Sequence, residues 1–185
     1  MNEGLIPGRY AKALLESAAE VNAEQGIYDV MRQLSQSFAG EPSLVKVLEN
    51  PFVDSTDKIK LVETAAGISA DDKATYPLFS RFLGLLVSNN RISMTRDIAL
   101  AYMELYRKAH NICKVSVTSA SPMTPADEDR LKSLIERHLN GAQMEYTSDV
   151  DPDLIGGFVV KINNEILDAS VANELKHLRL NLLSK

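Results

Sequence analysis

Three aspartates at alternate positions come closest to a chemical motif in this chain. Asp149, Asp151 and Asp153 could begin a calcium-binding loop, because such a loop takes oxygen ligands at its first, third and fifth positions. The loop also needs a glycine at its sixth position and a glutamate at its twelfth, where this chain has Leu154 and Val160. The spacing therefore favours a solvated acidic turn. A small metal-dependent enzyme that uses this Asp149/Asp151/Asp153 edge stays open as an alternative function.

Two adjacent glycines follow the aspartates. A phosphate-binding loop needs glycines that aim several backbone amides at the start of a helix. Gly156 and Gly157 instead lead into residues 158–162, which alternate as a strand does, so we expect a bulge or a close approach of two backbones. Asp168 and Ser170 follow a second strand, and either can cap a helix that begins after them.

The remaining reactive side chains are scattered along the sequence. His110, His138 and His177 have no two-histidine zinc spacing, and the single Cys113 has no Cys-x-x-Cys partner. The sequence contains no Gly-x-Ser-x-Gly turn and no Gly-x-x-x-x-Gly-Lys loop. We therefore predict no catalytic residues, no cofactor and no metal.

Charge and composition restrict the class of partner. The 185 residues are 45% hydrophobic and 24% charged, with a net charge of −5 that is spread over both halves. Neither half offers the basic surface that phosphate neutralisation requires, so nucleic acid is not expected as a partner, and binding to anionic lipid is disfavoured. The start of the chain shows no secretory or organellar leader, and the most apolar stretch, 78–87, is too short to span a bilayer. We expect a cytoplasmic protein that reaches a membrane only through its partners.

Helical periodicity dominates the first 110 residues. The first helix carries Ile6, Tyr10 and Val21 at helical spacing, and Gly26 is expected to separate it from a second helix that stops at Gly40. Four more helices follow. The third covers 41–49 and is ended by Asn50-Pro51, and the fourth is capped by Asp54 and Ser55 and ended by Gly67. The fifth runs from the Asp71-Asp72 pair to Asn89-Asn90, and the sixth carries Met94 to Leu105. These short amphipathic helices predict a six-helix bundle.

The pattern changes to a period of two after Asn111. Residues 113–118 alternate as a half-buried strand, and Thr124-Pro125 then starts a helix that runs to the Asn140-Gly141 stop. A strand is expected around 144–147, followed by a hairpin that turns at Asn163-Asn164. A last helix carries Val171, Leu175, Leu178 and Leu182, which completes the order β-α-β-β-β-α. The fold class is therefore α+β, with a helical domain at 1–110 and a small mixed domain at 111–185.

Two predicted helices have more hydrophobic surface than one buried stripe needs. The fifth helix is apolar on almost all sides between residues 78 and 87, and the first helix carries two adjacent stripes. Each could be a central helix surrounded by its neighbours. For the pair, a groove that receives an amphipathic helix of another chain is the more economical explanation, since small residues would allow close approach: Ala11, Ala13, Ala18 and Gly84.

Several short motifs, in this order and spacing, resemble one family: the delta subunit of F-type ATP synthases and its mitochondrial relative, the oligomycin-sensitivity-conferring protein. The motifs are Arg9-Tyr10-Ala11-Lys12-Ala13-Leu14, Asn50-Pro51, Leu86-Val87-Ser88-Asn89-Asn90-Arg91-Ile92, Ser119-Ala120, and the structural block Asp151-Pro152, Gly156-Gly157, Asp168 and Ser170. The family usually has a glycine in the hairpin turn. The Asn163-Asn164 pair found here keeps the same preference for positive φ.

The resemblance implies a non-catalytic connector in the peripheral stalk, at the cytoplasmic face of a bacterial inner membrane. Its residues 1–110 would bind the catalytic head and hold the N-terminal helix of an α subunit, and residues 111–185 would engage the C-terminal ends of the b subunits. Carried to matching positions, the α-subunit site would use Tyr10, Ala13, Leu14, Phe82, Leu85 and Asn89. A general cytoplasmic adaptor that binds some other helix stays open as an alternative.

Overall fold

The computed structural model describes residues 5–69, 72–139, 141–163 and 165–183, and side chains up to residue 176 together with that of residue 179. The chain divides into two compact units, Met1–Ala109 and His110–Lys185, and each is described by itself. Three residues used in the predictions lie outside the described residues. They are Asp71 at the predicted start of the fifth helix, Asn140 at a predicted helix stop, and Asn164 in the predicted hairpin turn.

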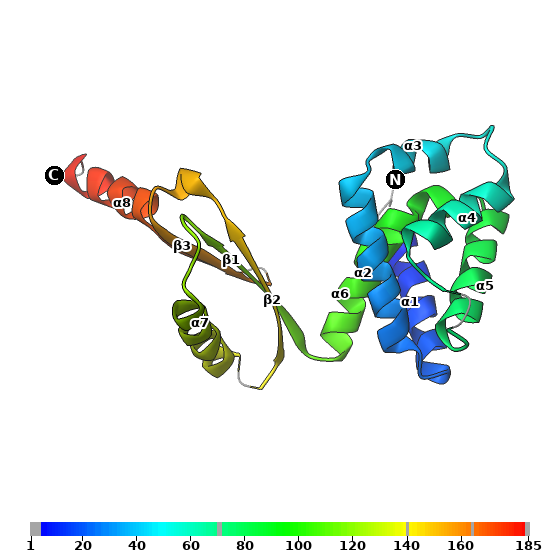
Figure 1. Cartoon of the computed structure of the whole chain (residues 1–185), viewed down its shortest axis with the longest axis horizontal. Helices are drawn as coiled ribbons and strands as arrows, with labels where there is room; N and C mark the ends of the chain where they lie inside the picture. Colours follow the sequence, from blue (N-terminus) through cyan, green and yellow to red (C-terminus); the bar gives the residue numbers. More distant parts are fainter. Residues whose placement is uncertain (1–4, 70–71, 140, 164, 184–185) are drawn as a thin grey trace. The chain divides into compact units, whose positions relative to one another are not determined.

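The first unit is the predicted helical bundle (Figure 1). Its described part contains α1 (Leu5–Glu20), α2 (Glu24–Gly40), α3 (Ser43–Glu49), α4 (Ser55–Ala65), α5 (Thr75–Ser88), the 3-10 turn η1 (Ile92–Met94) and α6 (Thr95–Ala109). Helix α6 packs closely along α1 and α2, and α2, α5 and α6 contribute large buried side chains to the core. Large, fully buried side chains of that core are Ile27, Met31, Leu34, Phe79, Leu83, Leu86, Ile98 and Tyr102.

The predicted break at Gly26 is wrong. Helix α1 ends at Glu20, and the chain turns at Asn22, whose φ of 54° lies in the left-handed region that asparagine tolerates. Gly26 lies inside α2, where an added Cβ would collide with the hydroxyl of Thr75 on α5. Its missing side chain therefore serves helix packing instead of ending a helix.

The other helix ends follow the sequence signals. Asn50 is extended (φ −68°, ψ 120°) before Pro51, and Gly67 has a φ of 62° after α4. Asp54 precedes α4, and its carboxylate accepts a hydrogen bond from Ser55 N at 3.1 Å. At the start of α5 the Asp72 carboxylate accepts hydrogen bonds from the backbone of the first turn. The hydrogen bond with the Thr75 side chain, together with the backbone bonds from Thr75 and Ala74, holds the pKa of Asp72 below its usual value.

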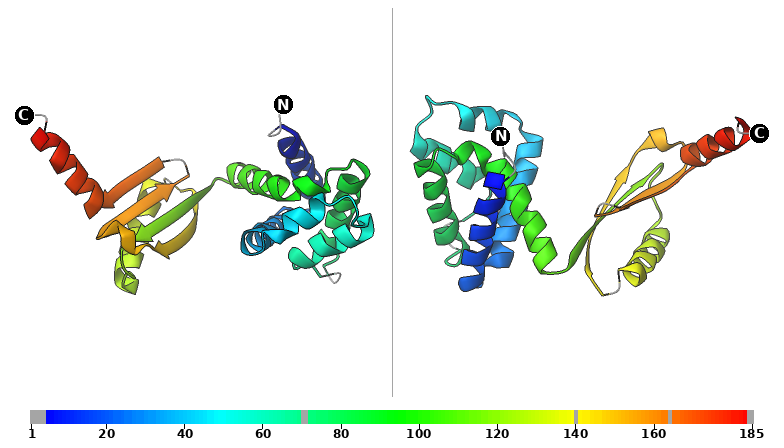
Figure 2. Two further views of the ribbon diagram at one scale, coloured as in Figure 1. Left: turned by 90° about the horizontal axis from the view of Figure 1, so that it is seen from above. Right: turned by 180° about the vertical axis from the view of Figure 1, so that it is seen from behind.

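The second unit is a four-stranded mixed sheet with α7 on one face (Figures 1 and 2). Its elements are β1 (Ile112–Ser119), α7 (Pro125–His138), β2 (Gln143–Val150), the 3-10 turn η2 (Pro152–Leu154), β3 (Gly157–Ile162), β4 (Glu165–Ser170) and α8 (Val171–Leu183). The strand order is β2-β1-β3-β4, with β1 parallel to β2 and antiparallel to β3. The predicted order β-α-β-β-β-α is confirmed.

Alternation along the strands builds the core of this unit. Val117 pairs with Val160, and Val160 pairs with Leu167, so all three lie on one face of the sheet. Val115, Val117 and Val160 meet Ile135 of α7 in a buried cluster. Thr124 caps α7 as predicted, since its hydroxyl accepts a hydrogen bond from Asp127 N, and Pro125 occupies the first helical position.

The block from Asp151 to Ser170 holds the ends of the strands together. The Asp151 carboxylate accepts a hydrogen bond from Asp153 N at 3.0 Å within the turn that Pro152 starts. Gly157 has a φ of 79°, and an added Cβ there would lie 3.1 Å from the Cα of Ser170 and still closer to the carbonyl oxygen of Ala169. The expected close approach of two backbones is therefore found at Gly157.

Two side chains of the block organise the step from β4 to α8. The Asp168 carboxylate accepts a hydrogen bond from Ser170 N at 3.0 Å, and the Ser170 hydroxyl accepts one from Asn173 N at 3.3 Å. The Ser170 hydroxyl therefore caps α8, and the hydrogen bond to Asp168 holds Ser170 in position. Gly156 lies against Val171, since an added Cβ would meet its Cγ2 at 2.9 Å.

Candidate partner-binding surfaces

Helices α1 and α5 bring the predicted α-subunit site residues to one side of the bundle. Tyr10 on α1 and Phe82 on α5 form an edge-to-face aromatic pair, with ring centroids 6.4 Å apart and planes at 71°. Leu85, one turn beyond Phe82, is 50% exposed although it is a large apolar side chain. We call the six residues Tyr10, Ala13, Leu14, Phe82, Leu85 and Asn89 the α1–α5 surface.

These six residues do not all face outward. Leu14 and Phe82 are buried and belong to the core of the unit, whereas Ala13, Leu85 and Asn89 are exposed and Tyr10 is half-buried. The Asn89 amide donates a hydrogen bond to the carbonyl oxygen of Leu85 at 2.9 Å, so it also closes the end of α5. The surface thus combines three exposed side chains, of which Ala13 and Leu85 are apolar, with the aromatic pair of Tyr10 and Phe82.

Two of the four small residues, Ala11 and Ala18, have a different use from the expected one. Ala11 and Ala18 are fully buried in the stripe of α1 that faces the core, so their size allows α1 to approach its own neighbours, above all α6. Gly84 is exposed, and a Cβ there would meet nothing within 4 Å. Of the four small residues, Ala13 and Gly84 are exposed and so remain available to a partner.

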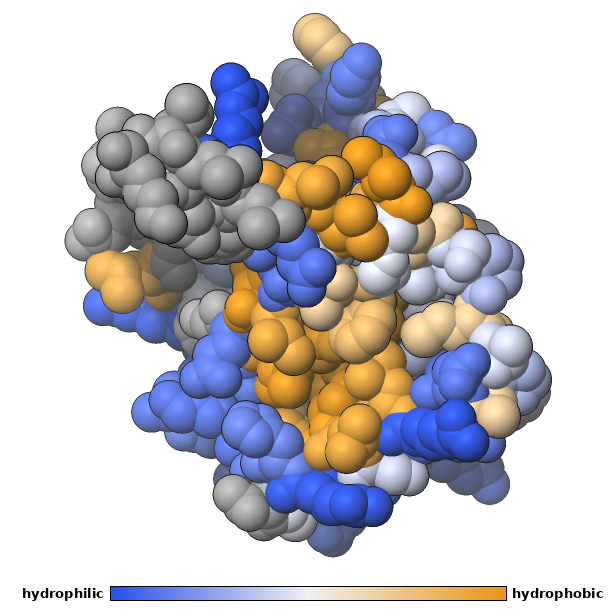
Figure 3. Space-filling view, turned by 90° about the vertical axis from the view of Figure 1, so that its left-hand side faces the viewer, coloured by the Kyte–Doolittle hydropathy of each residue, from blue (hydrophilic) through white to orange (hydrophobic). Residues whose placement is uncertain are grey.

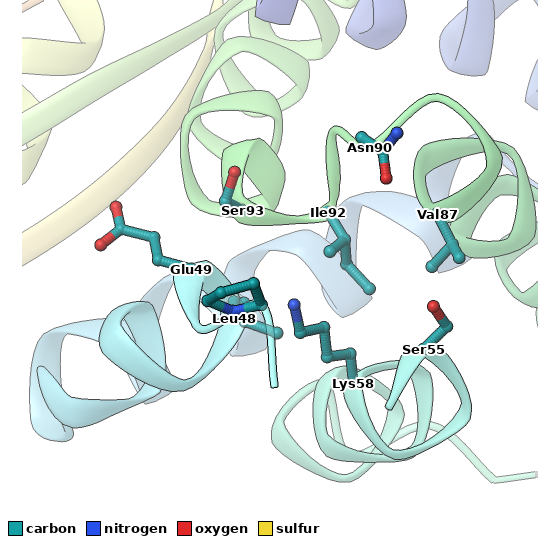
Figure 4. A pocket seen from close by; sticks show the side chains of 9 residues that line it. Leu48, Glu49, Ser55, Lys58, Val87, Asn90, Ile92 and Ser93 are labelled. Carbon is teal, nitrogen blue, oxygen red and sulfur yellow. The ribbon is translucent and has the colours of Figure 1, made fainter. Parts of the chain in front are cut away.

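A shallow hollow of about 220 Å³ lies between α3, α4, α5 and η1 (Figure 4). Sequence reasoning did not find it. Lys58 extends its amino group towards Leu48 and Ile92, while the carboxylate of Glu49 points away from the hollow (Figure 4). The lining combines apolar side chains with the hydroxyls of Ser55 and Ser93 and the amino group of Lys58. Its lining residues are Leu48, Glu49, Pro51, Ser55, Lys58, Val87, Asn90, Ile92 and Ser93.

The second unit carries an apolar groove of about 460 Å³ beside α7, which we call the α7–β4 groove. Figure 3 views the molecule from the side of this unit and shows hydrophobic residues gathered in one broad patch. Leu134 is 60% exposed there, and Ile166 and Leu167 are similarly open to solvent. The groove is lined by Leu131, Leu134, Ile135, His138, Phe158, Val160, Ile162, Glu165, Ile166 and Leu167.

The groove exists because α7 covers only part of its face of the sheet. Lys132 of α7 lies over the ring of Tyr146 on β2 at 4.5 Å and pairs with Glu128 at 3.0 Å. The hydrogen bond from Lys132 to Glu128 raises the pKa of the lysine above its usual value. Helix α7 thereby reaches over the β2 side and leaves β4 uncovered, with Leu167 of β4 64% exposed. The sequence signal was the adjacent apolar pair Ile166-Leu167, which must face both sides of an edge strand.

The aspartate edge does not assemble a metal site. In the part of the chain that the structure describes, no three His, Cys, Asp or Glu side chains converge to hold an ion. Asp151 already accepts the backbone hydrogen bond of its own turn.

No helix among the described residues is long and apolar enough to cross a membrane.

Comparisons with known proteins agree with this architecture. The family profile described as "ATP synthase delta (OSCP) subunit" matches residues 6–182. A protein of Parabacteroides distasonis named "ATP synthase subunit delta" is 37% identical over 183 residues, which is 99% of this chain and 98% of its own length. One of the same name from Bacteroides thetaiotaomicron is 37% identical over 185 residues, covering 100% and 97%. Synechococcus elongatus has another that is 33% identical over 173 residues, covering 94% and 93%.

A solved structure shares the fold. A chain of the cryo-EM structure of the Toxoplasma gondii mitochondrial ATP synthase hexamer matches with a TM-score of 0.73 and 21% identity, over 96% of this chain and 97% of that one. The family match over residues 6–182 and the bacterial relatives show that the alternative of a metal-dependent enzyme is wrong. The chain belongs to the ATP synthase delta (OSCP) subunit family and is a non-catalytic stator subunit that connects the catalytic head to the peripheral stalk.

Proposed function

We propose that the unit Met1–Ala109 binds the N-terminal helix of an ATP synthase α subunit on the α1–α5 surface. The half-exposed Leu85 beside the Tyr10–Phe82 pair is the observation that supports this most strongly. An amphipathic helix laid along α1 and α5 would cover the Leu85 side chain, which this unit leaves in water. The edge-to-face pair is held between two helices of the bundle, so it offers a rigid aromatic anchor with little entropy to lose on binding.

The unit His110–Lys185 engages the C-terminal ends of the b subunits through the α7–β4 groove. The groove has the composition that an amphipathic helix needs: an apolar floor from Phe158 and Val160 and an apolar wall from Leu134. Glu165 and His138 supply a polar rim. A helix with an apolar stripe and a basic residue at the edge fits this rim, because a cation would pair with Glu165.

The mechanical task sets the required affinity. Rotation of the central rotor exerts a torque on the catalytic head, and a stator subunit must hold the head without dissociating. A nanomolar dissociation constant corresponds to about 12 kcal/mol of binding free energy. Buried apolar anchors supply such energy more readily than exposed charge pairs, each of which contributes roughly 0–1 kcal/mol. Both proposed surfaces are apolar at their centre, which suits this requirement.

The bacterial relatives support a location at the cytoplasmic face of a bacterial inner membrane. The chain would be held there as a peripheral subunit, through its partners in the ATP synthase complex. Its net charge of −5 disfavours direct binding to anionic lipid.

Isothermal titration of the full chain with a synthetic α-subunit N-terminal peptide tests the first proposal. Leu85→Asp places a carboxylate on the α1–α5 surface and should weaken binding at least tenfold, because the charge would be desolvated under the bound helix. Leu100→Asp on α6 is the matched control, since Leu100 is 44% exposed in the same unit and lies outside this surface. Equal affinities of the Leu85→Asp chain and the unsubstituted chain would refute the proposed site.

Phe82 is a poorer target than Leu85 for this test. Phe82 is buried, so Phe82→Asp would bury an unpaired carboxylate and unfold the bundle before binding could be measured. Leu85 is half-exposed, so its replacement leaves the fold largely unaffected.

A further inference from the structure

Strand β4 is an edge of the sheet and is exposed on both faces. In the described part of the chain, the strand order β2-β1-β3-β4 leaves one side of β4 without a neighbouring strand (Figure 2). Every residue from Glu165 to Ala169 is exposed, with Ile166 at 65% and Leu167 at 64%. Successive residues of a strand point to opposite faces, so these two apolar side chains meet water on both sides of the sheet.

The other edge of the sheet, β2, is built differently. Tyr146 of β2 faces the core beside α7, and the residues that point the other way are polar: Gln143, Glu145, Thr147 and Asp149. A sheet face that meets water normally shows this alternation. An apolar edge, in contrast, pairs readily with another strand. Strand β4 has an apolar pair at its centre, so its edge is suited to pairing.

Hydrogen bonds at the end of β4 show which backbone groups face outward. Val171 N donates to the carbonyl oxygen of Gly156 at 3.0 Å, on the β3 side. Alternate residues of a strand direct their N–H and C=O to the same neighbour, so Leu167 and Ala169 also face β3. Ile166 therefore directs both of its backbone groups away from β3, towards the outer edge.

Side chains close the α8 end of this outer edge. Ser170 N, which also points outward, donates to the Asp168 carboxylate at 3.0 Å. The outward carbonyl oxygen of Asp168 accepts a hydrogen bond from the Asn173 amide at 3.3 Å. The place for a further strand is therefore centred on Ile166, whose N–H and C=O can form one complete pair of ladder bonds.

Charge and hydrophobicity specify what pairs at this place. A helix in the α7–β4 groove would cover Leu167 and leave Ile166, which points to the other face, in water. A second copy of the chain is disfavoured, because two β4 strands side by side would add Glu165 and Asp168 of one copy to those of the other, with no basic residue in either strand. An extended segment with apolar residues on both faces and a lysine or arginine near Glu165 fits the edge.

We propose that β4 accepts a fifth strand, supplied by an extended segment of the same b subunit whose helix occupies the α7–β4 groove. The inference rests on the proposed function for the identity of the partner and adds the way in which the partner binds. The added strand forms the N–H and C=O bonds of Ile166, covers its side chain, and pairs its basic residue with Glu165. Helix and strand of one partner then hold β4 together, so the partner dissociates only when both contacts open.

Hydrogen exchange of the full chain, with and without purified b subunits, tests the added strand. The Ile166 amide faces water in the free chain and should exchange at least about tenfold more slowly in the complex, because it donates to the added strand. The Leu167 amide faces β3 and should exchange slowly in both states, so it is the internal control. NMR reads each amide separately after the exchange is quenched.

Two proline variants check the direction of these amides. Ile166→Pro removes an outward N–H, so it should change the melting temperature little and weaken the binding of b subunits at least about fivefold. Leu167→Pro removes an N–H that faces β3 and should lower the melting temperature strongly. The exchange measurement uses the unsubstituted chain, so it decides even if Ile166→Pro fails to fold.

The outcomes separate this inference from the proposed function. Binding of b subunits with an Ile166 amide that exchanges as fast as in the free chain overturns the added strand and leaves the groove proposal standing. A chain that binds no b subunit overturns both. An Ile166 amide that is already protected in a free chain that sediments as a dimer also overturns the added strand, because a second copy would then occupy the edge.

Discussion

Replacing Gly157 by alanine should destabilise the second unit strongly, and the structure shows why. The backbone at Gly157 has a φ of 79°, a region that a residue with a Cβ adopts at a cost of roughly 1–2 kcal/mol. An added Cβ would also overlap the carbonyl oxygen of Ala169 and lie 3.1 Å from the Cα of Ser170. These are backbone atoms, so no side-chain rotation can relieve the overlap, and the end of β4 must move away.

The size of the effect follows from what that movement breaks. Gly157 pairs with Ser170, and separating them loosens the end of the β3–β4 ladder and the cap of α8. Each lost hydrogen bond costs about 1 kcal/mol, so with the φ strain the total should reach about 3 kcal/mol or more. For a unit of this size, that lowers the melting temperature by roughly 12 °C or more.

Gly141→Ala is a control that separates the two contributions. Gly141 also has a positive φ, of 91°, but an added Cβ there meets nothing within 4 Å. Scanning calorimetry of the full chain should show a drop of roughly 4–16 °C for Gly141→Ala, from φ strain alone. Equal melting temperatures for the two variants would refute the argument that Gly157 is required by a close backbone approach.

Two further predictions concern pH and the first unit. Burial raises the pKa of Tyr102 above its usual value, so the unfolded chain ionises first, and stability should fall above pH 10 by up to about 1.4 kcal/mol per pH unit. Urea unfolding at pH 9 and 11 measures this slope, and Tyr102→Phe should reduce it; an unchanged slope would contradict the assignment. Asp72 has a lowered pKa, so its cap stabilises α5 above the unfolded value of 3.8 and is lost as pH falls below it. Asp72→Ala should cost about 1 kcal/mol at pH 7 and nothing at pH 2, and an equal cost at both would speak against the cap.

The elements that could be predicted are those whose signals are local. The caps at Asp54 and Thr124, the extended residue before Pro51 and the alternation through Val115 and Val117 each depend on a few neighbouring residues. Local hydrogen bonding and backbone sterics decide such features, and these are readable from the residue types.

The features that could not be predicted depend on contacts between distant segments. Gly26 looked like a helix breaker, yet it is a glycine because Thr75, about fifty residues later, occupies the space of a side chain. Tyr10 and Phe82 were both assigned to the surface, but only packing shows that Phe82 is buried while Leu85 is open. The α7–β4 groove was missed because a periodic pattern tells which residues of α7 are apolar and not how much of the sheet the helix covers.

The central claim is that one passive chain joins the catalytic head to the peripheral stalk. Sedimentation of purified catalytic heads with b subunits, with and without the full chain, tests it most directly. The account predicts that head and b subunits sediment together at a one-to-one ratio of chain to head only when the chain is present, and that Leu85→Asp raises the concentration of chain needed for this at least tenfold. Co-sedimentation without the chain, or a chain that does not bind the head, would contradict it.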